Sequence, residues 1–484
     1  MSKDKHFYIT TTLPYVNADP HVGFAMEIIR ADAVARWRRL QGDEVFFNTG
    51  TDEHGAKIQE AATKEGIAPQ VYTDRLALKF RELKELLNLS VDNFIRTTDA
   101  HHVMAAQEFW RRCDANGDIY KKFYKIKYCV GCELEKTESE LDEHGRCPIH
   151  PNRELEIREE ENYFFRWSKY QQPLLDFYAA HPDFVIPDFR FNEMKAFVER
   201  GLEDFSISRL KSKMPWGVAV PGDDEHVMYV WFDALVNYIS AIGWPDDMTR
   251  FDSWWPVVQY CGKDNNRQQS AMWQAMLMSA KLPPSKHIVI NGFIMSGGQK
   301  MSKSLGNVIS PVDIIEAFKG VTPFPEDVLR FVLLHDLPSF EDGDLTMESV
   351  KASYVANLQN GIGNLTSRIM KMATTHLSCP IEILKSSPFP DEFIFAIEKF
   401  DIKRALEFVM SEIKALDLEI QHKEPFKVIK TDPEKGKVLI EELTRRLYAT
   451  SHLLSPFLPR TNEEIKRLIR EHKMPEQPLF NRLP

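Results

Sequence analysis

The chain has 484 residues, of which 43% are hydrophobic and 27% charged, so it is long enough for two to four domains with buried cores. An N-terminus without an apolar run and only six cysteines argue against a secreted disulfide scaffold, and we expect a cytoplasmic protein. The formal net charge of −10 argues against indiscriminate nucleic-acid binding but allows a local basic surface. Candidates for such a surface are Lys121, Lys122, Lys125 and Lys127, although a solvated face is the simpler interpretation of this charge run.

Strands and helices alternate over the first part of the chain. Residues 7–13 have the β-branched and aromatic composition of a buried strand, which Pro14 and the Asn-Ala-Asp-Pro turn at 17–20 end. The segments that follow are a helix at about 22–40, a strand at 44–50, a helix at 71–88 and a strand at 94–98. This alternation predicts parallel βαβ units and therefore an α/β class nucleotide-binding sheet.

The alternation stops near residue 117, and the irregular, charged sequence up to about residue 222 indicates an insertion. Strand-like segments resume at 226–232, 257–262 and 287–295, and the apolar run 226–244 fits a buried strand followed by a helix better than a membrane span. From about 347 the pattern is typical of long helices. We therefore expect a split α/β domain (1–116 and 223–346), an insertion (117–222) and a helical domain (347–484).

Two short motifs flank the expected sheet. Pro20-His21-Val22-Gly23 lies where the first strand meets the first helix, and a helix N-terminus offers free backbone N–H groups to a phosphate. Lys300-Met301-Ser302-Lys303-Ser304 follows two glycines, and two lysines on such a loop can neutralise a polyphosphate in a transition state. Ser310-Pro311 then predicts the start of a helix. A turn histidine and an exposed basic loop are the simpler interpretations.

A third motif joins Cys129-x2-Cys132 to Cys147-x2-His150 in the insertion. Three thiolates and one imidazole at this spacing fit a tetrahedral zinc ion, and a disulfide explains the Cys-x2-His pair poorly. Because all four positions are filled by protein, we expect one structural zinc per chain, in a knuckle at about 125–155.

The first two motifs resemble the HIGH and KMSKS signatures of class I aminoacyl-tRNA synthetases, and the surrounding text is similar to the methionyl-tRNA synthetase family over essentially the whole chain. The matching stretches are Leu13-Pro14-Tyr15-Val16-Asn17, Thr49 to Gly55, Asp204 to Arg209, Tyr229 to Leu235 and Gly262-Lys263-Asp264. The resemblance implies a Rossmann-like catalytic domain, a zinc-knuckle insertion and an α-helical anticodon-binding bundle.

The resemblance also implies roles for individual residues. His21, Gly23, Asp264, Lys300 and Lys303 would bind ATP, with His21, the loop lysines, Lys263 and Arg209 assisting catalysis. Asp52 would receive the α-ammonium of the amino acid. The side-chain pocket would be lined by Leu13, Tyr15, Trp231, Leu235, Tyr238 and Gln269, whose apolar and aromatic surfaces suit a thioether. In the helical domain Asn364, Arg368 and Phe426 would bind the anticodon.

The chain departs from the family pattern at three of these positions. Phe24 stands where the HIGH signature ends in histidine, so either another group such as Asn17 or Gln268 replaces the missing donor or activation is slow. Gln269 stands where the family has a histidine near the methionine side chain. Phe426 replaces a stacking tryptophan and keeps an aromatic face.

The expected activity is methionine–tRNA ligation, in which methionine and ATP give methionyl-adenylate before transfer to tRNA(Met). Mg²⁺ would accompany ATP, no membrane contact is expected, and a monomer is expected because nothing after residue 470 resembles the dimerisation domain of some members. One alternative is a class I synthetase for another apolar amino acid, although the insertion is too short for the editing domain that those relatives carry. The other is a non-catalytic tRNA-binding paralogue.

Overall fold

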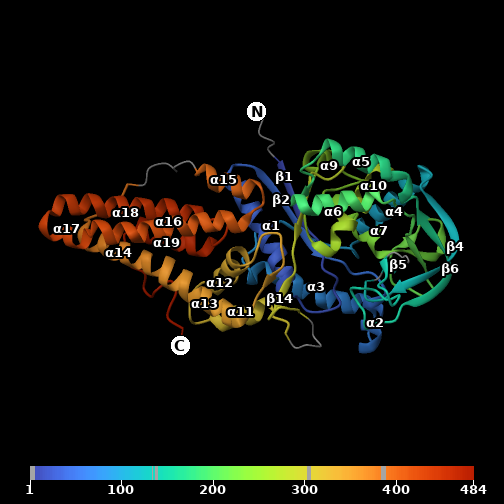
Figure 1. The fold of residues 1–484 in the computed structure, drawn as a ribbon, viewed down its shortest axis with the longest axis horizontal. Helices are drawn as coiled ribbons and strands as arrows, with labels where there is room; N and C mark the ends of the chain where they lie inside the picture. Colours follow the sequence, from blue (N-terminus) through green and yellow to red (C-terminus); the bar gives the residue numbers. More distant parts are fainter. Residues whose placement is uncertain (1–5, 133, 137–139, 302–306, 383–388, 484) are drawn as a thin grey trace.

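A six-stranded parallel sheet forms the centre of the α/β part of the molecule (Figure 1). The computed structural model describes residues 6–132, 134–136, 140–301, 307–382 and 389–483. The strands lie in the order β3 (Asn93–Arg96), β2 (Glu44–Thr51), β1 (His6–Thr11), β12 (Val258–Gly262), β13 (His287–Asn291) and β7 (Val185–Ile186). The strand order reverses between β1 and β12, and ligands bind at the carboxyl ends of the strands beside such a reversal.

Helices pack on this sheet and join its strands. They are α1 (Val22–Leu40), α2 (Ala56–Glu65), α3 (Pro69–Leu86), α4 (Ala100–Ala115), α9 (Met248–Trp254) and α10 (Trp273–Ser279). Helix α1 has the expected bounds, because His21 caps its first turn and the preceding Asn-Ala-Asp-Pro turn ends the strand. Helix α2 was not expected from the sequence.

The insertion contains a second, antiparallel sheet. Its strands lie in the order β5 (Leu134–Lys136), β4 (Ile119–Cys129), β6 (Glu156–Phe165) and β8 (Phe205–Ser206). Helices α5 (Gln171–Ala180) and α6 (Asp188–Glu199) follow β6, and β9 (Ser208–Leu210), β10 (Ala219–Val220) and β11 (Asp223–Met228) form a small sheet. This segment is therefore more regular than the sequence suggested.

Two strand predictions need correction. In the segment 226–232 the strand β11 ends at Met228, and the chain turns into α7 (Val230–Ala234) and α8 (Asn237–Ser240). The segment 287–295 is divided between β13 and β14 (Ile294–Ser296), which pairs with β15 (Gln299–Lys300) and β16 (Gly343–Asp344). In both places an uninterrupted apolar run concealed a change of direction, because burial alone does not distinguish a strand from a short helix.

The remainder of the described chain is mainly helical, and its C-terminal helices project from the α/β part as an elongated bundle (Figure 1). Its elements are α11 (Pro311–Phe318), α12 (Pro325–Phe331), the π-helical segments η6 (Val332–Asp336) and η7 (Tyr354–Gly363), α13 (Met347–Ser353), α14 (Asn364–His376), α15 (Asp391–Glu398), α16 (Ile402–Lys423), α17 (Pro425–Thr431), α18 (Pro433–Leu453) and α19 (Pro459–Glu471). The expected fold class, a parallel α/β sheet followed by a helical region, is confirmed.

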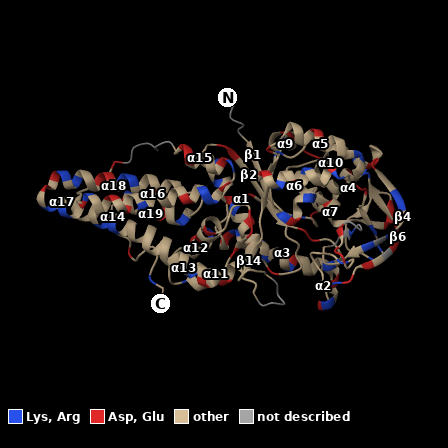
Figure 2. Ribbon diagram, viewed as in Figure 1, with Lys and Arg blue, Asp and Glu red and all other residues tan. Residues whose placement is uncertain are grey.

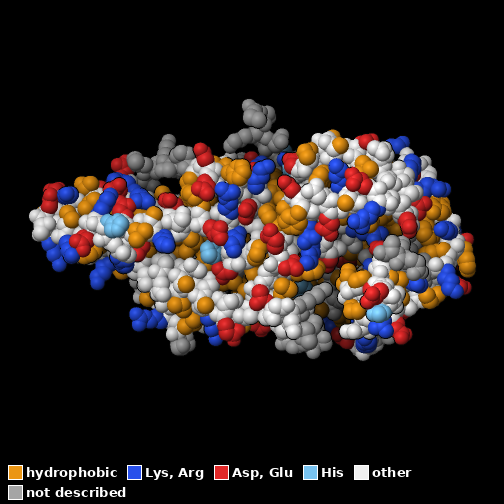
Figure 3. Space-filling view, viewed as in Figure 1, with side chains coloured by type: hydrophobic (Ala, Val, Ile, Leu, Met, Phe, Trp, Pro, Cys, Tyr) orange, Lys and Arg blue, Asp and Glu red, His pale blue; other side chains and the backbone are white. Residues whose placement is uncertain are grey.

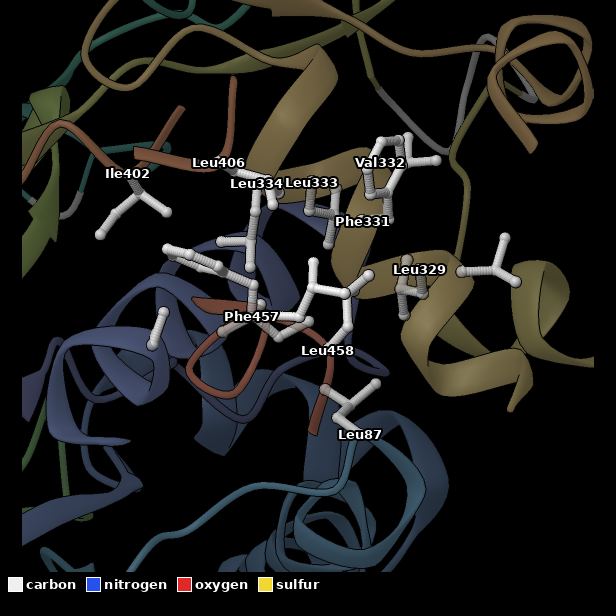
Figure 4. Packing of buried hydrophobic residues seen from close by; sticks show 14 of the residues in the cluster. Leu87, Leu329, Phe331, Val332, Leu333, Leu334, Ile402, Leu406, Phe457 and Leu458 are labelled. Carbon is white, nitrogen blue, oxygen red and sulfur yellow. The ribbon is translucent and has the colours of Figure 1, made fainter. Parts of the chain in front are cut away.

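One hydrophobic core joins the two parts of the molecule. Figure 4 shows Leu87, which follows α3, beside Leu458 of the turn before α19, while Leu406 of α16 lies near Leu334 in the same cluster. All of these side chains are buried, so the bundle is packed against the α/β part through apolar contacts.

The surface carries mixed charge. On the face shown in Figure 3, acidic and basic side chains are interspersed over both parts of the molecule. No helix within the described residues combines the length and the apolar composition that a membrane span needs.

Candidate active site

Expected site residues from three strands meet at the carboxyl edge of the parallel sheet. Leu13 follows β1, Asp52 follows β2 and Asp264 follows β12, so all three lie beside the reversal in strand order. The segments after β1 and β2 are joined directly, since Tyr15 and Asp52 form a parallel bridge and the Asp52 N–H donates to the Pro14 carbonyl (3.0 Å). Asp52 is a buried carboxylate.

His21 is the N-cap of α1, and its ring is held in a defined tautomer. The Gly23 N–H donates to Nδ1 of His21 (3.1 Å), which leaves the imidazole proton on Nε2. Desolvation lowers the pKa of His21, although nearby Asp264 acts in the opposite direction. A β-carbon at Gly23 would lie 2.9 Å from Cε1 of His21, so glycine is needed for this contact. His21 is therefore a neutral donor at a helix N-terminus.

Phe24 occupies the position of the missing histidine. Its ring meets Phe80 of α3 edge-to-face at 5.5 Å and packs against the main core. Its role in this structure is therefore packing.

Glu53, which follows Asp52, is held by contacts with three side chains. Arg96 forms a two-point ion pair with the buried carboxylate of Glu53, at 2.7 Å and 2.8 Å, and the hydroxyls of Thr51 and Thr98 donate to the same carboxylate. Sequence reasoning did not identify this arrangement, which holds the chain immediately after Asp52.

The expected side-chain pocket is built from α7, α8 and the segment after β1. Trp231 is half-buried in α7, while Leu13, Leu235 and Tyr238 are buried. Gln269 belongs to the π-helical segment η4 (Gln268–Met272) and donates from Nε2 to the Tyr238 hydroxyl (2.7 Å). Gln259 donates in turn to Oε1 of Gln269 (2.7 Å). One of the two N–H groups of the Gln269 amide is therefore bonded to Tyr238.

Glu27 of α1 is a buried acidic residue close to the expected site that sequence reasoning did not single out. Its buried carboxyl accepts the Thr12 N–H at 2.8 Å. Burial raises the pKa of Glu27 to about 8; the Thr12 hydrogen bond opposes the rise and Asp264 adds to it. A glutamate within the apolar face of a predicted helix was the available sequence signal.

Two further expected residues follow β12 in the short 3-10 helix η3 (Lys263–Asn265). Lys263 pairs with Asp342 (2.7 Å) and lies 4.4 Å from the centre of the Phe293 ring. Asp264 is exposed, and a β-carbon at Gly262 would meet its Oδ1 at 2.7 Å.

Arg209 is buried between the insertion and the pocket. Its guanidinium donates to the Ser206 hydroxyl (2.8 Å) and the Ser208 carbonyl (2.6 Å), and it lies over the rings of Tyr229 (4.5 Å) and Tyr128 (5.5 Å). Arg209 thus joins strand β4 of the insertion to the start of α7.

The lysine loop is described only at its two ends. Lys300 ends β15 and its side chain is outside the described part, as is Lys303 entirely. After the loop, the Ile309 carbonyl accepts the Val22 N–H (3.1 Å), and Ser310 and Asp313 form a capping box at α11. The loop therefore ends beside His21, and the helix start predicted from Ser310-Pro311 is confirmed.

The four cysteine and histidine residues of the insertion come together in the structure. Their donor atoms all lie within 4.8 Å of one another, with Cys132 Sγ at 3.4 Å from Cys147 Sγ and 3.2 Å from His150 Nδ1. A tetrahedron with Zn–S bonds of about 2.3 Å has edges of about 3.8 Å, so this donor set fits a metal ion of that kind. Lys57 of α2 donates to the Gly131 carbonyl (2.9 Å) and ties the cluster to the α/β part.

The expected anticodon residues lie on the helical bundle. Asn364 and Arg368 are exposed on α14, where Asn364 donates to Asn360 (3.5 Å) and Arg368 pairs with Asp417 of α16. Phe426, at the start of α17, is 41% exposed, as are other single phenylalanines such as Phe123 (69%) and Phe395 (56%), so its exposure alone does not indicate a partner molecule.

The lysines of β4 are compensated locally. Figure 2 shows basic β4 beside acidic β6, where Lys125 pairs with Glu159 (2.7 Å); Lys121 pairs with Asp223 (2.8 Å), and Lys122 lies over the Phe164 ring. These contacts favour the interpretation of a solvated face.

Comparison with known proteins places the chain in one family. A family model described as "tRNA synthetases class I (M)" matches residues 7–154 and 135–370. The methionine–tRNA ligase of Thermosynechococcus vestitus is 45% identical over 80% of this chain and 73% of its own length, and that of Thermotoga maritima is 40% identical over 97% and 76%. The structure is similar to Mycobacterium tuberculosis methionyl-tRNA synthetase in complex with methionyl-adenylate, with a TM-score of 0.90, 33% identity and coverage of 99% and 100%.

Proposed function

The chain belongs to the class I methionyl-tRNA synthetases, and we propose that the residues at the carboxyl edge of its parallel sheet carry out that family's chemistry. The enzyme is a methionine–tRNA ligase. The methionine carboxylate attacks the α-phosphorus of ATP, which gives methionyl-adenylate and releases pyrophosphate. A ribose hydroxyl of the 3′ adenosine of tRNA(Met) then attacks the methionyl carbonyl, which forms the ester and releases AMP.

In the activation step, His21 donates from Nε2 to a phosphate oxygen on which negative charge develops. Its neutral, pre-oriented ring supports this role, because a donor fixed in advance stabilises the transition state more than the ground state. Gly23 allows the phosphates to approach the N-terminus of α1. Lys300 and Lys303 neutralise the phosphates from the loop, Asp264 binds the ribose, and Lys263 and Arg209 assist.

Methionine is held at both of its ends. Asp52 binds the ammonium group, and the thioether lies among Leu13, Tyr15, Trp231, Leu235 and Tyr238. Because Gln269 donates to the Tyr238 oxygen, the Tyr238 hydroxyl proton is directed elsewhere and is available to the sulfur. Gln269 therefore contributes by orienting Tyr238.

Two metal ions belong to this proposal. Mg²⁺ bound with ATP would neutralise the phosphates during activation. One zinc ion would be held by Cys129, Cys132, Cys147 and His150 and would stabilise the insertion.

The bundle would bind tRNA through Asn364, Arg368 and Phe426. Phe426 offers a stacking face, and Arg368 would exchange Asp417 for the edge of an anticodon base. We propose that residues 1–116 and 223–346 carry catalysis, 117–222 the zinc knuckle and 347–484 tRNA binding. The enzyme would act as a monomer in the cytoplasm.

The observation that supports the proposal most is the bridge between Tyr15 and Asp52, which joins Asp52 to the segment between β1 and α1 that carries Leu13 and His21. Charging of tRNA(Met) with labelled methionine tests it. His21→Ala should lower kcat about 10²- to 10³-fold with little change in the KM for methionine, because the lost contact forms in the transition state. Wild-type turnover by folded His21→Ala would contradict the assignment.

A further inference from the structure

A buried carboxylate connects the loop that carries Asp52 to the wall of the side-chain pocket. Asp233 of α7 is fully buried and accepts from His54 Nδ1 at 3.1 Å. Its other oxygen lies 3.5 Å from Nε2 of His102 on α4, whose Nδ1 is 3.0 Å from the Ser240 hydroxyl on α8. The loop after β2 and helix α4 therefore both reach the Asp233 carboxylate, and α8 contacts His102.

The two ends of this connection are the two ends of the expected substrate site. His54 is two residues after Asp52, on the loop that follows β2. Asp233 lies between Trp231 and Leu235, and Ser240 is two residues after Tyr238. The contact between His54 and Asp233 thus fixes the ammonium-binding loop relative to the pocket segment.

The loop is also fixed on its other side. Trp216 donates from its indole to the Glu53 carbonyl (2.5 Å), and its own carbonyl accepts the Gly55 N–H (3.2 Å). The Glu53–Arg96 ion pair holds the loop to β3. These contacts hold the loop around Asp52 together without Asp233. We therefore expect loss of the Asp233 charge to change the position of α7 relative to this loop rather than the internal structure of the loop.

The separation between the two sites matters for selectivity. An amino acid that binds through its ammonium group and the end of its side chain fits best when its length matches the distance between Asp52 and the pocket. One methylene in an apolar pocket changes kcat/KM by about 10- to 200-fold, which is the discrimination that such a spacing can provide.

We infer that the His54–Asp233–His102 unit positions Asp52 against the thioether pocket and so sets the side-chain length that the enzyme accepts. This inference rests on the proposed function and deepens it. All three are positioning residues, since they act through Asp52 and the pocket wall.

The test is pyrophosphate exchange with methionine, S-methylcysteine, which is one methylene shorter, and ethionine, which is one longer. It compares the wild type with Asp233→Asn and with the milder Ser240→Ala, which removes only the hydroxyl partner of His102. The matched control is Tyr170→Phe, which removes one hydrogen bond to Asp118, another buried carboxylate of the same part of the molecule.

Asp233→Asn should raise the KM for methionine about tenfold, leave the KM for ATP within about twofold, and reduce the preference for methionine over both analogues about tenfold. Ser240→Ala should change the same ratios in the same direction by less, and it carries the test if Asp233→Asn does not fold. Tyr170→Phe should leave them unchanged.

Unchanged analogue ratios in folded Asp233→Asn, or in Ser240→Ala if that variant carries the test, would overturn the inference while leaving the proposed function intact. Equal shifts in Tyr170→Phe would also overturn it, because they would make the effect a general loss of stability. A wild type without methionine-dependent exchange would overturn the proposed function and this inference with it.

Discussion

Three consecutive residues, Asp52, Glu53 and His54, have different roles, and only the first was identified from the sequence. The resemblance to a known family assigned Asp52 directly. The roles of Glu53 and His54 depend on Arg96 and Asp233, which lie far away in the chain. Local patterns of residue type cannot reveal such partners, because a buried ion pair is a property of the folded chain.

Glu27 gives a prediction about pH. Its folded pKa of about 8 lies above its ordinary value of 4.5, so between these pH values the unfolded chain loses a proton that the folded chain keeps. Stability is therefore lost as the pH rises through this window. Glu27→Gln cannot ionise, and its free energy of unfolding relative to the wild type should increase from pH 5 to pH 8. Denaturant titrations that differ by a constant across this range would contradict the raised pKa.

Gln269 gives a prediction about methionine recognition. Gln269→Ala removes the partner of both Tyr238 and Gln259 in a fully buried site, a change that costs about 1–3 kcal/mol. The KM for methionine should rise about 10- to 100-fold, while the KM for ATP should stay nearly constant in pyrophosphate exchange. A KM for methionine equal to that of the wild type would show that Tyr238 needs no orienting partner.

At the scale of elements, capped helices were easier to predict than strands. The bounds of α1 and the start of α11 followed from turn and capping residues. The hairpin of β4 and β6 was missed because its strands are charged and solvent-facing, with Lys125 opposite Glu159. The helix α7 was mistaken for a continued strand because it is short and apolar.

The metal cluster gives a prediction about the insertion. Metal analysis of reduced protein should find about one zinc per chain, because three thiolates and one imidazole complete a tetrahedron. Cys132→Ser should lower the zinc content and the thermal stability, whereas Cys379→Ser changes an exposed cysteine outside the cluster and should alter neither. Full zinc content in Cys132→Ser would contradict the assignment of that ligand.

At the scale of the whole molecule, Arg330 of α12 joins the α/β part to the bundle. Its buried guanidinium pairs with Asp32 of α1 (2.8 Å) and donates to the carbonyls of Phe457 (2.6 Å) and Pro456 (3.1 Å). Phe457, one of these partners, belongs to the apolar core of Figure 4. The resemblance predicted both parts of the molecule, but the contacts between them could be read only from the structure.

Arg330→Ala should therefore lower stability in a single transition that includes both parts. Asp32 keeps Arg36 as a partner (2.8 Å), so the loss should be smaller than the about 3–5 kcal/mol of an unpaired buried charge, but at least about 1.5 kcal/mol because two carbonyls also lose a charged donor. Arg445→Ala, which breaks an exposed pair within α18, should cost about 1 kcal/mol or less. Calorimetry and circular dichroism measure the difference. Equal losses in the two variants would contradict a joining role for Arg330.

The central claim is that this site activates methionine. Amino-acid-dependent ATP–pyrophosphate exchange, measured with each standard amino acid in turn, tests it most directly. We expect exchange with methionine alone, despite Phe24 and Gln269 at the two positions where the family has histidine. Exchange with a different amino acid, or with none in folded protein that still binds tRNA, would contradict it.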